Sequence, residues 1–107
     1  MLRDFYLGFI KIHILHHALQ DAVYGLWLIE ELNEHGYKLS PGTLYPILHS
    51  LEDKGYIQST KRNVAGKIRI YYQTTVEGQI ALEEAKEKIK ELVQEVLMDE
   101  PNKKTEA

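Results

Sequence analysis

The fold is decided by the stretch Ser40-Pro41-Gly42-Thr43-Leu44-Tyr45-Pro46-Ile47-Leu48-His49-Ser50-Leu51-Glu52-Asp53-Lys54-Gly55-Tyr56-Ile57. It predicts a short helix with a marked start and stop, followed at once by a strand. Ser40 is suited to cap the helix, Pro41 to occupy its first turn, and Gly55 to end it. Apolar residues recur in it at helical spacing and define one buried stripe, made of Leu44, Ile47, Leu48 and Leu51.

The opposite face of this helix is small, polar or aromatic and nearly free of acid. It carries Gly42, Thr43, Tyr45, Pro46, His49 and Ser50. A helix with leucines on one side and such a face on the other fits the major groove of DNA, and this favours a DNA-binding regulator. Pro46 lacks a backbone donor and crowds the carbonyl of Gly42. We therefore expect an irregular or 3₁₀ first turn, tolerated because Gly42 has no Cβ.

Two strands with a basic turn follow the helix. The segments Tyr56–Lys61 and Ile68–Gln73 alternate in hydrophobicity, and Asn63–Lys67 is expected to form the turn between them. From Lys54 to Val76 the chain contains no acid, so the hairpin is predicted to be a cationic wing. Its cations, expected beside the phosphate backbone or in the minor groove, are Lys61, Arg62, Lys67 and Arg69. The alternative is a small α+β domain whose cationic hairpin is merely solvated.

The helices on either side of this unit carry more apolar surface than one small chain can bury. A first helix is expected over Arg3–Gln20, and because it is apolar nearly all round, it must be covered on two sides, most simply with help from a second subunit. A second helix is expected over Tyr24–His35. Thr75 is expected to cap a last helix over Val76–Met98. The coiled-coil-like seam of that helix consists of Leu82, Ala85, Ile89, Leu92 and Val96.

The expected order is helix, helix, helix, strand, strand, helix. It predicts an α+β, mostly helical fold: a winged helix-turn-helix with an added C-terminal dimerisation helix. We expect a DNA-binding domain over residues 1–75, a dimerisation helix over 76–100 and a disordered tail over 101–107, which has no apolar anchor.

Composition narrows the functional classes. The chain has 107 residues, enough for one domain, and no cysteine, which excludes disulfides and thiolate metal sites. Its net charge of −3 argues weakly against nucleic acid, although one segment is clearly cationic. No run is long and apolar enough to cross a bilayer and no signal peptide is expected, so a cytoplasmic location fits. The sequence lacks catalytic motifs, and we expect no enzyme.

Three histidines and the single tryptophan allow more than one interpretation. His13 and His17 are four residues apart and could share a metal, but two imidazoles are too few and no carboxylate stands beside them in the same helical register. We therefore predict no metal and no cofactor. With His16 they are expected to line a subunit interface or a pocket wall, and a haem or metal sensor is the alternative. Trp27 is expected to be a partly covered rim residue or, alternatively, a platform for a flat ligand.

Motifs over nearly the whole chain resemble the PadR family of transcriptional regulators. The blocks that carry the resemblance are Tyr24-Gly25, Leu39-Ser40-Pro41-Gly42-Thr43-Leu44-Tyr45-Pro46 with Leu48 and Leu51, Lys54-Gly55-Tyr56-Ile57, Tyr71-Tyr72 and Thr75-x-x-Gly78. The short C-terminal part is similar to the smaller subfamily. Departures from the family pattern bear on the wing contacts and the effector class rather than on the fold. They stand at Trp27, Ala65-Gly66-Lys67-Ile68, Ile70 and Thr74.

The resemblance implies a homodimeric repressor on a pseudo-palindromic DNA operator, released by a small aromatic or drug-like effector near the subunit interface. It assigns DNA readout to Ser40, Gly42, Thr43, Tyr45 and Pro46, and the base of the wing to Lys67 and Arg69. For the effector pocket, expected between the two subunits, the candidates are Phe9, His13, Trp27, Leu92, Val93 and Val96. The alternative function, supported by the net acidity, is a winged-helix protein-interaction module that does not bind DNA.

Overall fold

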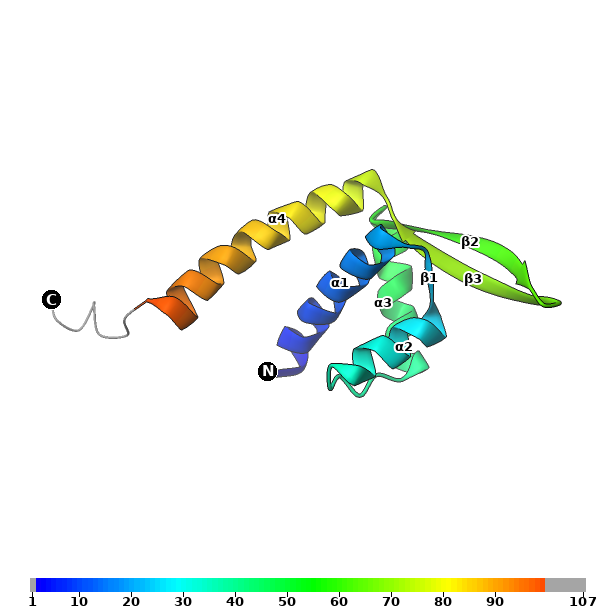
Figure 1. Cartoon of the computed structure of the whole chain (residues 1–107), viewed down its shortest axis with the longest axis horizontal. Coiled ribbons are helices and arrows are strands. Elements are labelled where there is room, and N and C mark those ends of the chain that lie inside the picture. Colours follow the sequence, from blue (N-terminus) through cyan, green and yellow to red (C-terminus); the bar gives the residue numbers. More distant parts are fainter. Residues whose placement is uncertain (1, 100–107) are drawn as a thin grey trace, which may run out of the picture.

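The structure, a computed structural model, describes residues 2–99. In chain order the elements are α1 (Leu2–Gln20), β1 (Val23–Tyr24), α2 (Gly25–Glu34), α3 (Pro41–Asp53), β2 (Ile57–Val64), β3 (Lys67–Thr74), α4 (Val76–Val93) and a π-helical turn, η1 (Gln94–Met98) (Figure 1). This order confirms the expected α+β winged helix-turn-helix with an added C-terminal helix. The expected tail lies outside the described residues, and the division into domains stays a prediction.

One hydrophobic core joins the helices to the sheet. Its largest fully buried side chains are Ile14, Leu28, Leu32, Leu44, Leu48, Ile57 and Leu82. The stripe expected on α3 is buried along its whole length, and α2 packs against it with the two leucines that face inward. Because the inner side of α3 is fixed in this core, its opposite face is held toward solvent.

The start of α3 differs from the expectation in two details. Ser40 stands at the N-cap but its side chain does not cap the helix; its hydroxyl instead donates to the Thr43 hydroxyl at 3.4 Å. The expected irregular or 3₁₀ first turn is found only in part: α3 is α-helical from Pro41 and the Ser40 carbonyl accepts from the Leu44 N–H at 2.9 Å, but it also accepts a 3₁₀-type bond from the Thr43 N–H at 3.1 Å. Pro46 fits because Gly42, one turn earlier, has no side chain for its ring to clash with. Gly42 is also exposed, so water can bond the carbonyl that would otherwise accept from residue 46.

The wing is longer than expected and its turn is tighter. Strands β2 and β3 pair from Ile57↔Thr74 to Val64↔Lys67 and leave only Ala65-Gly66 as the loop. The two loop residues have φ values of 51° and 82°, as in a type I′ turn, whose twist matches that of a hairpin. The expected turn over Asn63–Lys67 is thus too long, because its outer residues belong to the strands.

The sheet contains one strand that the sequence analysis did not expect. The strand order is β1-β3-β2, with β1 pairing antiparallel to β3 through Val23↔Tyr72 and Tyr24↔Tyr71. Tyr72 is buried in the core, and Tyr71 is half-buried on the other face of the sheet. Residues 23–24 tie the loop before α2 to the base of the wing.

Helix α4 is anchored to the body at its first turn. Thr75 Oγ1 accepts a hydrogen bond from the Gly78 N–H at 3.0 Å and caps the helix as predicted. The same hydroxyl donates to the Gly55 carbonyl at 2.6 Å, and the Thr75 N–H donates to the Tyr56 carbonyl at 3.0 Å. A Cβ on Gly78 would fall onto the Tyr56 carbonyl oxygen, so this close approach requires glycine.

Beyond this anchor α4 leaves the body (Figure 1), and its last turn becomes the π-helical η1 rather than α-helix. Leu82 of the expected seam is buried and Ala85 is half-buried, whereas Ile89, Leu92 and Val96 are exposed. The N-terminal half of α1 is uncovered too, at Leu2, Phe5, Tyr6 and Phe9. Two helices therefore leave apolar surface in solvent. Within residues 2–99 no helix has both the length and the apolar character needed to cross a membrane.

Candidate nucleic-acid interface

The outer face of α3 is open to solvent. Ser40, Gly42, Tyr45, Pro46 and His49 are exposed, and Thr43 and Ser50 are half-buried. No acid occurs in the sequence from the N-cap of α3 to its last buried leucine. The first turn also directs the positive end of the helix dipole outward. This face can exchange hydrogen bonds with anionic and polar partners without an opposing charge.

Tyr45 is held in place by the start of α2. A Cβ on Gly25 would collide with the ring and hydroxyl of Tyr45, so the ring lies directly against the Gly25 backbone. Tyr45 still exposes 38% of its surface. A side chain that is already fixed loses little conformational freedom when it contacts a partner.

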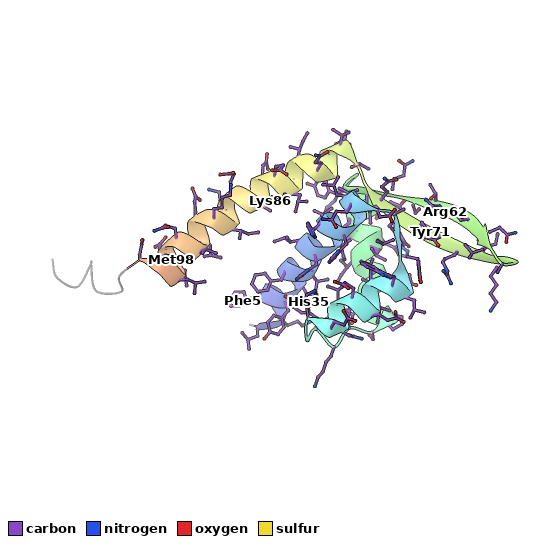
Figure 2. All side chains as sticks on the ribbon, in the orientation of Figure 1. Phe5, His35, Arg62, Tyr71, Lys86 and Met98 are labelled. Carbon is purple, nitrogen blue, oxygen red and sulfur yellow. The ribbon has the colours of Figure 1, made fainter. Side chains whose placement is uncertain are left out.

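The two arginines of the wing lie on tyrosine rings. Arg62 Cζ is 4.3 Å from the centre of the Tyr71 ring, and Arg69 Cζ is 4.1 Å from that of Tyr24. The two rings meet edge to face at 5.5 Å, and Arg62 and Arg69 are register partners across the hairpin. We call these four residues the arginine–tyrosine cluster. Arg62 and Tyr71 are labelled on the wing in Figure 2. Stacking orients each guanidinium while leaving its N–H groups available for other partners.

A hollow joins α3 to the wing. It is lined by Tyr24, Gly25, Leu26, Tyr45, Ile68, Arg69 and Ile70. It brings together Tyr45 and Arg69, two of the predicted DNA-binding residues, from elements far apart in the sequence. Lys61 and Lys67 are exposed, and no ion pair within residues 2–99 involves a cation of the wing. Tyr24 was not among the residues predicted for this site, although the Tyr24-Gly25 block of the family resemblance pointed to it.

Glu52 fixes the end of α3 to the wing. Its Oε2 accepts hydrogen bonds from the Ser59 hydroxyl at 2.7 Å and from the Ser59 N–H at 2.8 Å. The bond from the Ser59 hydroxyl, followed by that from its N–H, lowers the pKa of the Glu52 carboxyl from its ordinary value. An acid near the interface is thereby directed toward β2, and the end of α3 is joined to the start of that strand.

Comparison with known proteins decides the family. The family model described as "Transcriptional regulator PadR-like family" matches residues 14–84. The chain belongs to this family. It is 47% identical over 96 residues to "Transcriptional regulator Rv3488" of Mycobacterium tuberculosis, covering 90% of each chain. This PadR-like regulator is thus not an enzyme, as predicted.

Solved structures of PadR proteins have the same fold. A PadR family transcriptional regulator from Eggerthella lenta superposes with a TM-score of 0.78 at 32% identity, over 90% of this chain and 85% of that one. A PadR-like transcriptional regulator from Bacillus cereus gives 0.74 at 33% identity, over 87% and 95%.

Four of the six residues expected to hold an effector come together in this PadR-like regulator. Phe9, His13, Leu92 and Val93 line a groove of about 440 Å³ between α1 and α4. This groove forms within one chain. Trp27 lies elsewhere, in a separate hollow beside α1 and α2, and Val96 is exposed outside the lining of the groove.

The histidines are arranged differently from the expectation. The ring of His35, which directly follows α2, stacks on that of His13 at 4.9 Å, while the rings of His13 and His17 are 6.1 Å apart. The expectation that only two imidazoles meet is therefore wrong, because the packing of α1 on α2 supplies a third. Burial, and next the nearby His35, lower the pKa of His13; burial lowers that of His17 against the opposing effect of Glu31.

Proposed function

We propose that this PadR-like regulator is a homodimeric repressor that binds a pseudo-palindromic DNA operator through α3 and the wing. The observation that carries the proposal is that the acid-free outer face of α3 and the arginine–tyrosine cluster border one hollow, through Tyr45 and Arg69. A helix beside a cationic hairpin suits duplex DNA, since the helix can enter the major groove while the hairpin contacts the adjacent backbone.

The α3 residues would divide into two roles. The hydroxyls of Ser40 and Thr43, beside the positive end of the α3 dipole, suit a phosphate. Further along the helix, Tyr45, His49 and Ser50 would reach phosphates or base edges. Gly42 and Pro46 add little bulk, so the backbone of α3 could approach the duplex closely.

The wing would supply affinity rather than sequence information. Lys61, Arg62, Lys67 and Arg69 would contact phosphates or the minor groove, and such contacts make binding steeply dependent on salt. The stacked arginines suit this role because their planes are already oriented.

A second copy of this chain would cover the apolar surface that α1 and α4 leave in solvent. The uncovered residues include Phe5 and Phe9 on α1 and Ile89 and Leu92 on α4, all exposed by more than a third. A two-fold dimer would place its reading helices about 34 Å apart, one turn of DNA.

An aromatic or drug-like effector would fit the apolar groove between α1 and α4. Phe9 and His13 would contact it from α1, Leu92 and Val93 from α4. Because α4 also carries the dimer seam, a ligand there would change the spacing of the two reading helices and release the operator. Trp27, the only tryptophan, lies outside this groove.

Selection of bound sequences from a genomic DNA pool, followed by anisotropy titrations of the selected operator at several salt concentrations, tests the proposal. Tyr45→Ala or Thr43→Ala should weaken operator binding by about 1 kcal/mol, roughly fivefold, since each removes a hydrogen bond. Lys67→Ala should weaken binding to every sequence and reduce the salt slope by about 1. The matched control is Lys88→Ala on α4, an exposed cation far along the chain, which should change neither quantity.

A pool that yields no preferred sequence would contradict the proposal, as would equal effects of Lys67→Ala and Lys88→Ala. A protein-interaction module without DNA binding is the second candidate, favoured by the net charge of −3. A dimer that retains no DNA even at low salt would support that candidate instead.

A further inference from the structure

We propose that His13, His17 and His35, together with Glu31, form a binding site for a divalent transition-metal ion of the Zn²⁺ class. The site lies between α1 and α2, apart from the outer face of α3 and the wing. It shares His13 with the groove between α1 and α4, but it does not depend on the proposed function.

The donor atoms converge on one point. Each histidine offers a ring nitrogen, and these three atoms lie within 4.8 Å of one another. Glu31 Oε1 lies 3.6 Å from His17 Nε2 and 3.4 Å from His35 Nε2, so the carboxylate lies beside two of the three histidines but outside the group of three. Three imidazoles and one carboxylate are a complete set of four ligands for Zn²⁺.

The observed separations suit a shared ion better than they suit hydrogen bonds. With metal–ligand bonds of about 2.0–2.1 Å, neighbouring ligands of a tetrahedral ion are about 3.3–3.4 Å apart. The carboxylate distances to His17 and His35 are already near this edge length, while nitrogen–oxygen hydrogen bonds are normally shorter. The histidine nitrogens need to approach one another by at most about 1.5 Å, which rotation of the side chains can supply.

Two helical pairs build the site. His13 and His17 are four residues apart on α1, and Glu31 and His35 are four apart at the end of α2, so each pair faces one way. Joining such pairs from two packed helices is a common way to build metal sites in helical proteins. His35 is half-exposed at the α1–α2 boundary (Figure 2), which leaves an ion a path from solvent.

The chemistry of the donors selects the class of ion. Imidazole suits Zn²⁺, Co²⁺, Ni²⁺ and Cu²⁺, whereas Mg²⁺ and Ca²⁺ prefer sites made of oxygen ligands. The lack of cysteine in the chain leaves histidine and carboxylate as its strong ligands for such ions.

The test uses the full chain without a histidine tag, stripped with a chelator and titrated with Co²⁺ and then Zn²⁺. We expect one Co²⁺ per chain, with the intense visible absorption of a four-coordinate ion that Zn²⁺ then removes. The Trp27 ring lies 5.4 Å from that of His17, so Co²⁺ should also quench the fluorescence of this single tryptophan.

Variants identify the ligands. His35→Gln and Glu31→Gln should each lower Zn²⁺ affinity at least about tenfold, the scale that even residues supporting a ligand reach. The matched control is His16→Gln, because His16 is exposed and its ring touches that of His17 at 5.1 Å, but it lies outside the group of three. It should change the affinity less than about threefold.

Two results would overturn the proposal. The first is binding of less than one ion per chain with both metals. The second is an equal loss in His16→Gln and His35→Gln, which would indicate surface histidines acting singly. Circular dichroism of the metal-free variants checks that they fold. Both Glu31→Gln and His35→Gln must lose Zn²⁺ affinity, so that a folding defect in one variant cannot decide the outcome.

Discussion

Helices α3 and α4 are both amphipathic, but only α3 is complete within one chain. The four apolar residues of the α3 stripe are all buried, the most exposed of them at 8%. On α4 the seam is buried at Leu82 but 37% exposed at Ile89 and 56% at Leu92. The comparison teaches that the same amphipathic pattern can either complete the core of one chain or leave an apolar face exposed. The inner face of α3 is fully buried, so its outer face is free for a partner, whereas much of the inner face of α4 is exposed and in the proposed dimer would be covered by the second copy.

The sharpest test of this comparison makes the same substitution in both helices. Leu48→Ala in α3 should lower the free energy of unfolding by about 3 kcal/mol, because it leaves a cavity in the core. Leu92→Ala should change chain stability by about 0.5 kcal/mol or less at high dilution, yet weaken the proposed dimer by about 1–2 kcal/mol. Urea unfolding at several protein concentrations and sedimentation equilibrium measure the two effects. Equal, concentration-independent losses in both variants would remove the distinction.

The second prediction locates the point where α4 changes from anchored to free. Gly78→Ala should cost about 1–3 kcal/mol, since the new methyl meets the Tyr56 carbonyl oxygen and the backbone must shift. Gly8→Ala in α1 is the matched control, because no atom lies within 4 Å of the added Cβ and the helix should gain about 0.5–1 kcal/mol. Thermal unfolding compares them, and a stabilising Gly78→Ala would show that α4 is not anchored here.

The third and smallest prediction compares the carboxylates of the two helices. Glu52→Gln should cost about 1 kcal/mol at neutral pH, because Ser59 donates two hydrogen bonds to the carboxylate. Glu83→Gln on α4 breaks only an exposed pair with Lys86 and should cost about 0.3 kcal/mol.

Lowering the pH gives a further test of this comparison. The pKa of Glu52 is lower in the folded chain than its ordinary value of 4.5, so its contribution is present above that pH and is lost as the pH falls through the folded pKa. The stability difference between wild type and Glu52→Gln should therefore shrink below pH 4.5. A difference that stays constant into acid would mean that the Ser59 bonds do not favour the ionised form.

The sequence predicted the elements that carry a repeated local pattern. Three of the predicted features depend on patterns within a few neighbouring residues, and all three are found. They are the apolar stripe of α3, the alternation of the wing strands and the cap formed by Thr75. Strand β1 was missed because its two residues are too few to alternate. The predicted turn was too long because Ala65, a non-glycine residue with positive φ, carries no sequence signal for a tight turn.

The candidate site was predictable only where one element supplies it. The outer face of α3 follows from its buried face, so its residues could be named from periodicity. The stacking of Arg69 on Tyr24 and the approach of His35 to His13 depend on how separate elements pack. Periodicity within one helix or strand contains no information about such pairs. Trp27 and Val96 were grouped with the groove residues for the same reason, and the structure separates them.

The anchored start of α4 gives this helix the properties of a lever. Its 18 residues span about 27 Å at 1.5 Å each, so one degree of rotation at the root moves the far end by about 0.5 Å. The lock between Gly78 and the Tyr56 carbonyl stands at that root, where the wing and α3 also meet. A small tilt at the root therefore produces a larger displacement at the far end of α4. In the proposed dimer, a sub-ångström shift at the root of one chain would move the other subunit.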